Sequence, residues 1–167
     1  MLRRLLGSVL IVGAVGLGAA CGPADPTADP RASIAVARAL AVARHDHKAV
    51  LLNFGADWCP DCTVLDELFA QPPVTAFLDA HFHVVNIDVG RYPEGADASR
   101  NVSLAERYGV HPEIVGIPAL VVLTPDGRIV PAPTPVVWEH ARTFTADEVL
   151  RYLQDLQRAA GPASPYR

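Results

Sequence analysis

The hydrophobic and polar positions along the chain divide it into alternating helical and strand segments. An uninterrupted apolar run over residues 49–54, bounded by Gly55 and flanked by helical patterns, predicts a central strand covered on both faces. Other β-rich runs predict strands at residues 82–87, 119–123 and 128–130. Helical spacing predicts helices over residues 30–44, 59–70, 72–78, 103–109 and 146–158. This order predicts an α/β fold in which a mixed central sheet has helices on both faces.

Capping and turn residues mark the ends of these elements. Asp29 and Pro30 are typical of the N-cap and first position of a helix. The spacing Ser103–Glu106 and the spacing Thr145–Glu148 each predict a capping box at a helix start. The turn over residues 124–127 predicts a hairpin between the last two strands. The buried stripe of the first helix is expected at Ile34, Ala37, Leu40 and Ala41.

The first twenty residues have the layout of a secretory signal. Arg3 and Arg4 precede an apolar run over residues 5–20, which ends in small side chains. A permanent membrane-spanning helix, which needs about 20 apolar residues, is the alternative. We expect a signal peptide at residues 1–20, a lipidated cysteine with a Pro- and Asp-rich tether at 21–29, a folded domain at 30–160 and a flexible tail at 161–167.

The segment that ends in Cys21 resembles the lipobox of bacterial lipoproteins, in which the cysteine is acylated. Ala19 and Ala20 fit that pattern, whereas Gly18 stands where the family prefers leucine, so plain signal cleavage stays open. Of the three cysteines, two form a Cys-x-x-Cys motif further along the chain and Cys21 is left over. Lipidation would block the free thiol of Cys21. The resemblance implies an exported protein anchored to the membrane by an N-terminal lipid, on the periplasmic or extracellular side.

The charge balance is mildly acidic, with 14 Lys and Arg against 18 Asp and Glu, for a net charge of -4. A basic footprint of the kind that binds nucleic acid is absent from the sequence. We therefore expect no nucleic-acid partner.

The motif Cys59-Pro60-Asp61-Cys62 follows the predicted central strand and opens the next helix. Cys59 at the N-cap faces the amides of Asp61 and Cys62, because Pro60 at the first position has no N–H of its own. Such a position favours the thiolate over the thiol. Cys59 is therefore expected to be the nucleophile, and Cys62 the resolving thiol.

Two other interpretations of the cysteine pair stay open. A structural disulfide would close so short a loop that it stabilises little through chain entropy. A metal site would need further ligands, and the nearby histidine pairs, at 45 and 47 and at 81 and 83, lack the usual spacing. We therefore expect no metal at this motif.

Four segments of the chain together resemble the thioredoxin superfamily, over about residues 50–157. They are the segment 53–62, the strand segment 85–89, the helix exit 107–110 and the loop Gly116-Ile117-Pro118. The resemblance implies a thioredoxin-like fold, with a cis peptide bond before Pro118. It also implies that Ile117 and Pro118 bind an extended substrate segment, and that Trp58 lies at the rim of the active site.

The sequence departs from this family near the motif. Asn53 stands where a buried aspartate is usual, and Val84 stands near the place of a lysine. We expect Asn53 to lie behind Cys62, so that deprotonation of Cys62 depends on water or on the carboxylates of Asp57 and Asp61. The Asp61 carboxylate should also oppose the Cys59 thiolate. The segment 111–115 is longer than the usual connection and is expected to reshape the substrate groove.

The sequence thus predicts a thiol–disulfide oxidoreductase, acting as a reductase, whose partners are exported proteins with disulfides or thiols and a protein redox donor or acceptor. No bound cofactor is expected, because nothing in the chain resembles a flavin or nicotinamide site. The alternative is a non-catalytic substrate-binding or copper-handling assembly module of the same fold.

Overall fold

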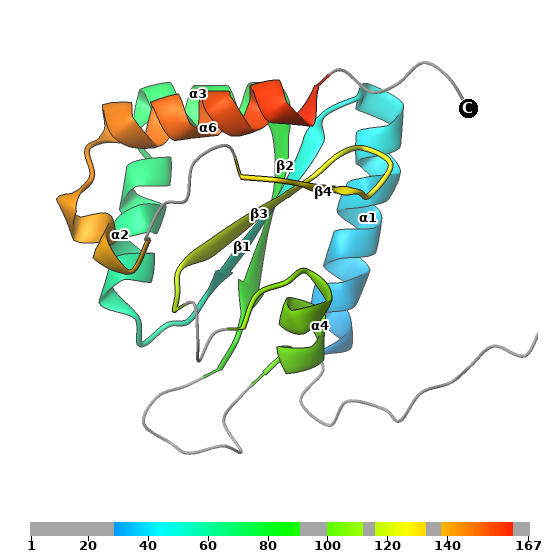
Figure 1. Cartoon of the computed structure of the whole chain (residues 1–167), viewed down its shortest axis with the longest axis horizontal. Coiled ribbons are helices and arrows are strands. Elements are labelled where there is room, and N and C mark those ends of the chain that lie inside the picture. Colours follow the sequence, from blue (N-terminus) through cyan, green and yellow to red (C-terminus); the bar gives the residue numbers. More distant parts are fainter. Residues whose placement is uncertain (1–28, 91–99, 112–115, 133–137, 162–167) are drawn as a thin grey trace, which may run out of the picture.

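Four strands and six helical segments make up the part of the chain that the structure describes (Figure 1). The structure is a computed structural model, and it describes residues 29–90, 100–111, 116–132 and 138–161. The strands are β1 (Ala49–Gly55), β2 (Phe82–Asp88), β3 (Ala119–Leu123) and β4 (Ile129–Val130). The helical segments are α1 (Pro30–Asp46), α2 (Pro60–Phe69), α3 (Pro72–His81), α4 (Val102–Arg107), the 3₁₀ segment η2 (Trp138–Thr143) and α6 (Ala146–Ala160).

The strands form one mixed sheet in the order β2-β1-β3-β4. Strand β1 pairs with β2 in parallel and with β3 in antiparallel, and β3 forms the hairpin with β4. Asn53 lies opposite Asn86 on β2 and opposite Leu120 on β3. The central place of β1 explains its nearly continuous apolar sequence, and it confirms the predicted central strand.

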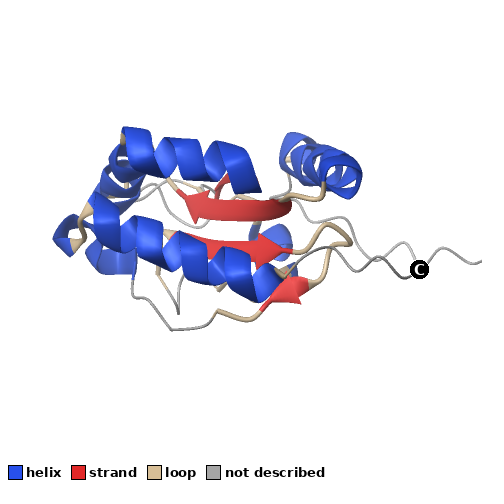
Figure 2. Ribbon diagram, turned by 90° about the horizontal axis from the view of Figure 1, so that it is seen from above, coloured by secondary structure: helices blue, strands red, loops and turns tan. Residues whose placement is uncertain are grey.

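Alternate residues of β1 face two separate cores, one on each side of the sheet. Val50, Leu52 and Phe54 pack with residues of α1 and α4. Ala49 and Leu51 pack with residues of α2, α3 and α6. Helices therefore cover both faces of the strands, as the two views in Figures 1 and 2 show, and the predicted thioredoxin-like architecture is confirmed.

Helix caps account for where several elements begin. The Asp29 side chain accepts the Arg31 N–H at the start of α1. At the start of α6, the Thr145 hydroxyl accepts the Glu148 N–H while the Glu148 carboxylate accepts the Thr145 N–H. Both caps were predicted, and both are confirmed.

Two local predictions were wrong. The buried face of α1 carries Val36 and Ala43, and of the predicted stripe only Leu40 packs against this core. Ile34 is 49% exposed and Ala37 and Ala41 are exposed, because the sheet contacts a different side of this alanine-rich helix. Helix α4 begins at Val102, so Ser103 lies inside it. Asn101, with φ of 53°, is its N-cap instead, and its side chain donates to the Asp88 carbonyl.

Several predictions fall on residues outside the described ranges. They are the signal peptide at 1–20, nearly all of the tether at 21–29, most of the tail at 161–167, and most of the loops at 90–100 and 111–115. Among the helices that the structure does describe, none has the length and apolar character needed to cross a membrane.

Candidate active site

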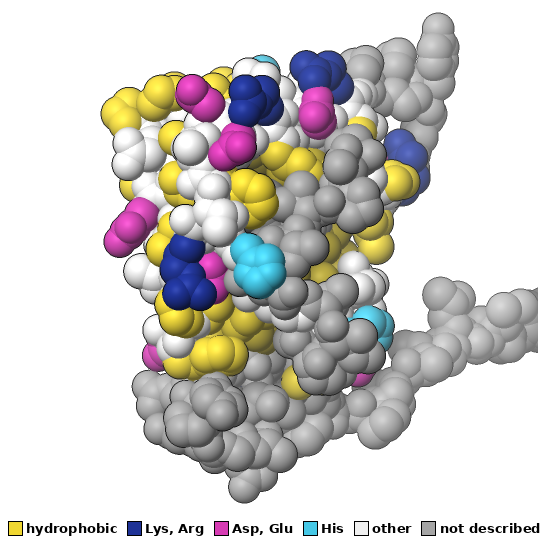
Figure 3. Space-filling model, turned by 60° about the vertical axis from the view of Figure 1, so that its left-hand side comes forward, with side chains coloured by type: hydrophobic (Ala, Val, Ile, Leu, Met, Phe, Trp, Pro, Cys, Tyr) yellow, Lys and Arg dark blue, Asp and Glu magenta, His cyan; other side chains and the backbone are white. Residues whose placement is uncertain are grey.

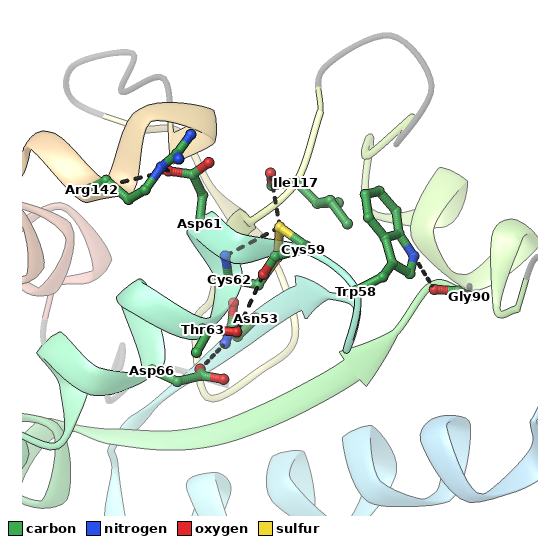
Figure 4. Close-up of a disulfide and its surroundings, with 10 residues drawn as sticks. All are labelled: Asn53, Trp58, Cys59, Asp61, Cys62, Thr63, Asp66, Gly90, Ile117 and Arg142. Atoms are coloured by element: carbon green, nitrogen blue, oxygen red, sulfur yellow. Dashed lines mark hydrogen bonds and ion pairs between the residues drawn. A yellow bond between two sulfur atoms is a disulfide. The ribbon is translucent and has the colours of Figure 1, made fainter. Parts of the chain in front are cut away.

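Cys59 and Cys62 form a disulfide at the point where β1 gives way to α2 (Figure 4). Cys59 is the N-cap of α2, Pro60 follows at its first position, and the Cys62 N–H donates to Cys59 Sγ at 3.1 Å. This is the geometry predicted for a thiolate at a helix N-terminus. Exposure does not separate the two cysteines, since Cys59 is 4% and Cys62 is 7% exposed. The two cysteines differ instead in the residues that lie next to each sulfur atom.

The loop before β3 lies against the Cys59 side of the disulfide. Cys59 Sγ is 3.6 Å from the Ile117 carbonyl oxygen. The Ile117–Pro118 peptide bond is cis, as the resemblance implied, and both residues are buried. The substrate-binding role of these two residues stays a prediction.

Trp58 borders the site on the side away from Asp61 and Arg142, as Figure 4 shows. Its indole Nε1 donates to the Gly90 carbonyl at 2.7 Å, while much of the ring is exposed. The hydrogen bond fixes one edge of the ring and leaves apolar surface beside the cysteines. This position agrees with the predicted place of Trp58 at the rim.

A cavity of about 370 Å³ lies on the Cys62 side of the disulfide. Cys62, Asn53, Asp66 and Gly55 are among the residues that line it. A Cβ added to Gly55 would lie 3.3 Å from Cys62 Sγ, which is tighter than an ordinary van der Waals contact. Gly55 therefore lets the strand approach the resolving thiol closely.

Asn53 is buried behind the disulfide, where its position was predicted. Its amide donates to Asp66 Oδ1 at 3.2 Å and to Asn86 Oδ1 at 3.1 Å. Asn53 Oδ1 is buried and has no hydrogen-bond partner among the described residues. Since buried polar atoms are normally paired, this oxygen is an exception at the site.

Asp66 is the carboxylate that the sequence analysis missed. Partial burial raises the pKa of Asp66, and the hydrogen bond from Asn53 acts in the opposite direction. The available signal was its spacing, because Asp66 lies four positions after Cys62 and so shares one face of α2 with it. Asp66 therefore provides a proton acceptor on the Cys62 side of the site.

The two carboxylates named from the sequence have different surroundings. Asp57 is exposed before the motif and lines the cavity together with Cys62, so its predicted place near this thiol agrees with the structure. Asp61 is turned toward Arg142, whose Nε and main-chain N–H both donate to Asp61 Oδ1 at 3.2 Å (Figure 4). The expectation that Asp61 simply opposes the Cys59 thiolate did not include this cationic partner, and it requires revision.

Within the described ranges, no three His, Cys, Asp or Glu side chains lie together as a potential metal site. Of the histidines singled out in the sequence, His83 pairs with Asp46 at 2.9 Å. This contact lies between the end of α1 and strand β2, away from the cysteines.

The fold and the site together define a thioredoxin-like domain with a Cys-x-x-Cys disulfide at the start of a helix. The chain belongs to the thioredoxin-like family, whose model matches residues 31–125. The match includes the disulfide and the Ile117–Pro118 loop but not η2 or α6.

Several known proteins are similar to this chain. A disulphide isomerase from Xylella fastidiosa Temecula1 is 34% identical, with a TM-score of 0.63 over 80% of this chain and 95% of its own. The C-terminal domain of DsbD from Neisseria meningitidis, in its reduced form, is 25% identical, with a TM-score of 0.50 over 77% of this chain and 98% of its own. The thiol:disulfide interchange protein DsbD 2 of Pseudomonas aeruginosa is 33% identical over 92 residues, which are 54% of this chain but only 14% of that protein.

Proposed function

We propose that this chain is a thiol–disulfide oxidoreductase that reduces disulfides in exported proteins. The observation that carries the proposal is the Cys59–Cys62 disulfide at the N-terminus of α2, beside the Ile117 carbonyl. A carbonyl next to the reactive sulfur offers an extended client segment a main-chain hydrogen bond. The names of the similar proteins, a disulphide isomerase and a thiol:disulfide interchange protein, support the same chemistry.

The proposed cycle transfers two electrons to the client. The Cys59 thiolate attacks a client disulfide, forms a mixed disulfide and releases one client thiolate. Cys62 then loses its proton and attacks Cys59 Sγ, which releases the second client sulfur. The two client sulfurs leave as thiolates and take protons from solvent, the Cys59–Cys62 disulfide forms, and the proton released by Cys62 returns to solvent. A protein partner must then return two electrons.

The cavity contains groups that can accept the proton that Cys62 loses in the second step. Asp66 and Asn53 line it together with Cys62, and Asn53 Oδ1 has no partner among the described residues. A water molecule in this cavity passes the Cys62 proton to Asp66. A raised pKa makes Asp66 a better proton acceptor than an ordinary exposed carboxylate.

The surroundings of Cys59 favour reduction over oxidation of clients. A strong oxidant needs a highly stabilised thiolate. Here the described residues place one N–H on Cys59 Sγ, while the Ile117 carbonyl oxygen lies 3.6 Å from the same sulfur. This oxygen limits the stabilisation of the thiolate.

Export and membrane anchoring are part of the proposal. The signal-like residues 1–20 and the lipobox-like segment ending in Cys21 support them. Membrane fractionation with lipid labelling provides the test, because Cys21→Ser should lose the lipid and release the domain from membranes. An unlabelled wild-type protein whose Cys21→Ser variant fractionates identically would contradict the lipid anchor.

The enzymatic proposal is tested by reduction of insulin disulfides with dithiothreitol as electron donor. The wild-type protein should accelerate the reaction severalfold over dithiothreitol alone, and Cys59→Ser should return it to the uncatalysed rate. Wild-type protein that gives no acceleration would contradict reductase activity.

A further inference from the structure

Arg142 binds the carboxylate that stands between the two cysteines. Its Nε and its main-chain N–H each donate to Asp61 Oδ1 at 3.2 Å. The two residues are 81 positions apart and meet because η2 packs against α2. The Asp61 side chain is only 10% exposed, whereas that of Arg142 is 63% exposed. The contact therefore provides a charge partner for a carboxylate that has lost most of its water.

Asp61 and a Cys59 thiolate would compete for the same positive field. Both lie at the first turn of α2, where the free N–H groups favour a negative charge. An unpaired Asp61 carboxylate would raise the free energy of a thiolate two residues away. The guanidinium of Arg142 offsets that repulsion, and Figure 4 shows the carboxylate turned toward it.

We propose that Arg142 is a positioning residue for thiol–disulfide exchange, which holds and neutralises Asp61 so that the N-terminus of α2 can stabilise the Cys59 thiolate. This inference rests on the proposed function. It means that a residue of η2 affects the stability of the Cys59 thiolate, although η2 lies outside the residues 31–125 that the family model matches.

The ion pair between Arg142 and Asp61 lies at the protein surface, where the Arg142 side chain contacts solvent. On the face shown in Figure 3, basic, acidic and histidine side chains lie beside exposed hydrophobic surface. Among the side chains that the structure describes, the other titratable groups that line the cavity beside Cys62 or lie on η2 are Asp57, Asp66, Asp88 and His140. Because the Arg142 guanidinium is largely exposed, salt should weaken its effect on Cys59.

The test measures the alkylation rate of the reduced protein by iodoacetamide as a function of pH. Arg142→Gln should raise the pH midpoint of the thiolate and slow alkylation near neutral pH by about 3- to 10-fold. Arg142→Lys, which keeps the charge, should restore most of the rate. In the Asp61→Asn background, Arg142→Gln should have no further effect, because the carboxylate it neutralises is gone.

Arg128→Gln is the matched control. Arg128 is 69% exposed and its Nε contacts Asp126 at 3.1 Å, in the hairpin turn between β3 and β4. This variant should alkylate like wild type. An Arg142→Gln variant with the wild-type midpoint would overturn the inference, and so would an equal shift in the Asp61→Asn background. Alkylation requires no client, so these results are independent of the insulin assay that tests the proposed function.

Discussion

Purified Cys62→Ser protein, mixed with an oxidised client peptide, should accumulate a mixed disulfide through Cys59. Attack by Cys59 remains possible in this variant, whereas the thiol that resolves the intermediate is missing. We expect the trapped species to approach about one peptide per chain, against little in Cys59→Ser. Non-reducing mass spectrometry after acid quenching measures both.

The assignment of roles depends on this comparison, because the two cysteines are similarly buried. It rests on the Cys62 N–H that donates to Cys59 Sγ, and on the cavity that Cys62 lines. Cys59→Ser/Cys62→Ser is the control for non-specific peptide binding. Equal trapping by the two single variants would contradict the assigned order of attack.

Asn53→Asp should speed resolution of the mixed disulfide below about pH 8 and destabilise the reduced protein by about 1 to 3 kcal/mol. The new carboxylate would lie where the Asn53 amide now donates to Asp66 Oδ1 at 3.2 Å. Two carboxylates at this distance cannot both ionise easily, so one would have a raised pKa and act as a base near neutral pH. Stopped-flow kinetics and urea unfolding measure the two effects.

The destabilisation caused by Asn53→Asp should increase as the pH rises. A carboxyl group whose pKa is higher in the folded than in the unfolded protein carries no penalty at a pH below both values. The penalty should therefore be small below about pH 4 and grow as the pH rises toward the raised folded pKa. A constant cost across this range would contradict the proposed carboxylate pair.

The reciprocal change provides the control. Asp66→Asn removes the native carboxylate of the cavity and should slow resolution by about tenfold near neutral pH. Asn53→Asp/Asp66→Asn exchanges the two side chains and should recover much of the rate. Unchanged resolution in all three variants would show that neither residue receives the Cys62 proton.

The predictable parts of this protein were those set by local sequence. The apolar run of β1 requires cover on both faces, and the caps at Asp29, Cys59 and Thr145 depend on residues at most three positions away. The pattern was therefore sufficient for a mixed sheet with helices on both faces, whereas the thioredoxin-like fold and the cis bond before Pro118 were implied by the resemblance of the segments 53–62 and 116–118.

The parts that were missed depend on contacts between distant segments. The prediction of the buried side of α1 was wrong because alanines occur on all sides of this helix. Only the contacts with the sheet determine that Val36 and Ala43 are buried and Ile34 is not. Arg142 lies 81 residues after Asp61, so no spacing could connect them. Asp66 was within reach of a helical-spacing argument, but its role requires knowing that Asn53 on β1 lies beside it.

The reduction potential of the Cys59–Cys62 pair, measured in glutathione or dithiothreitol buffers, shows whether this pair can reduce client disulfides. An exchange-active reductant should have a value near roughly -270 mV, whereas a strongly oxidising pair lies near about -120 mV. We expect the first of these values for this protein. A potential well below about -300 mV, typical of structural disulfides, would contradict the claim that this pair exchanges with clients.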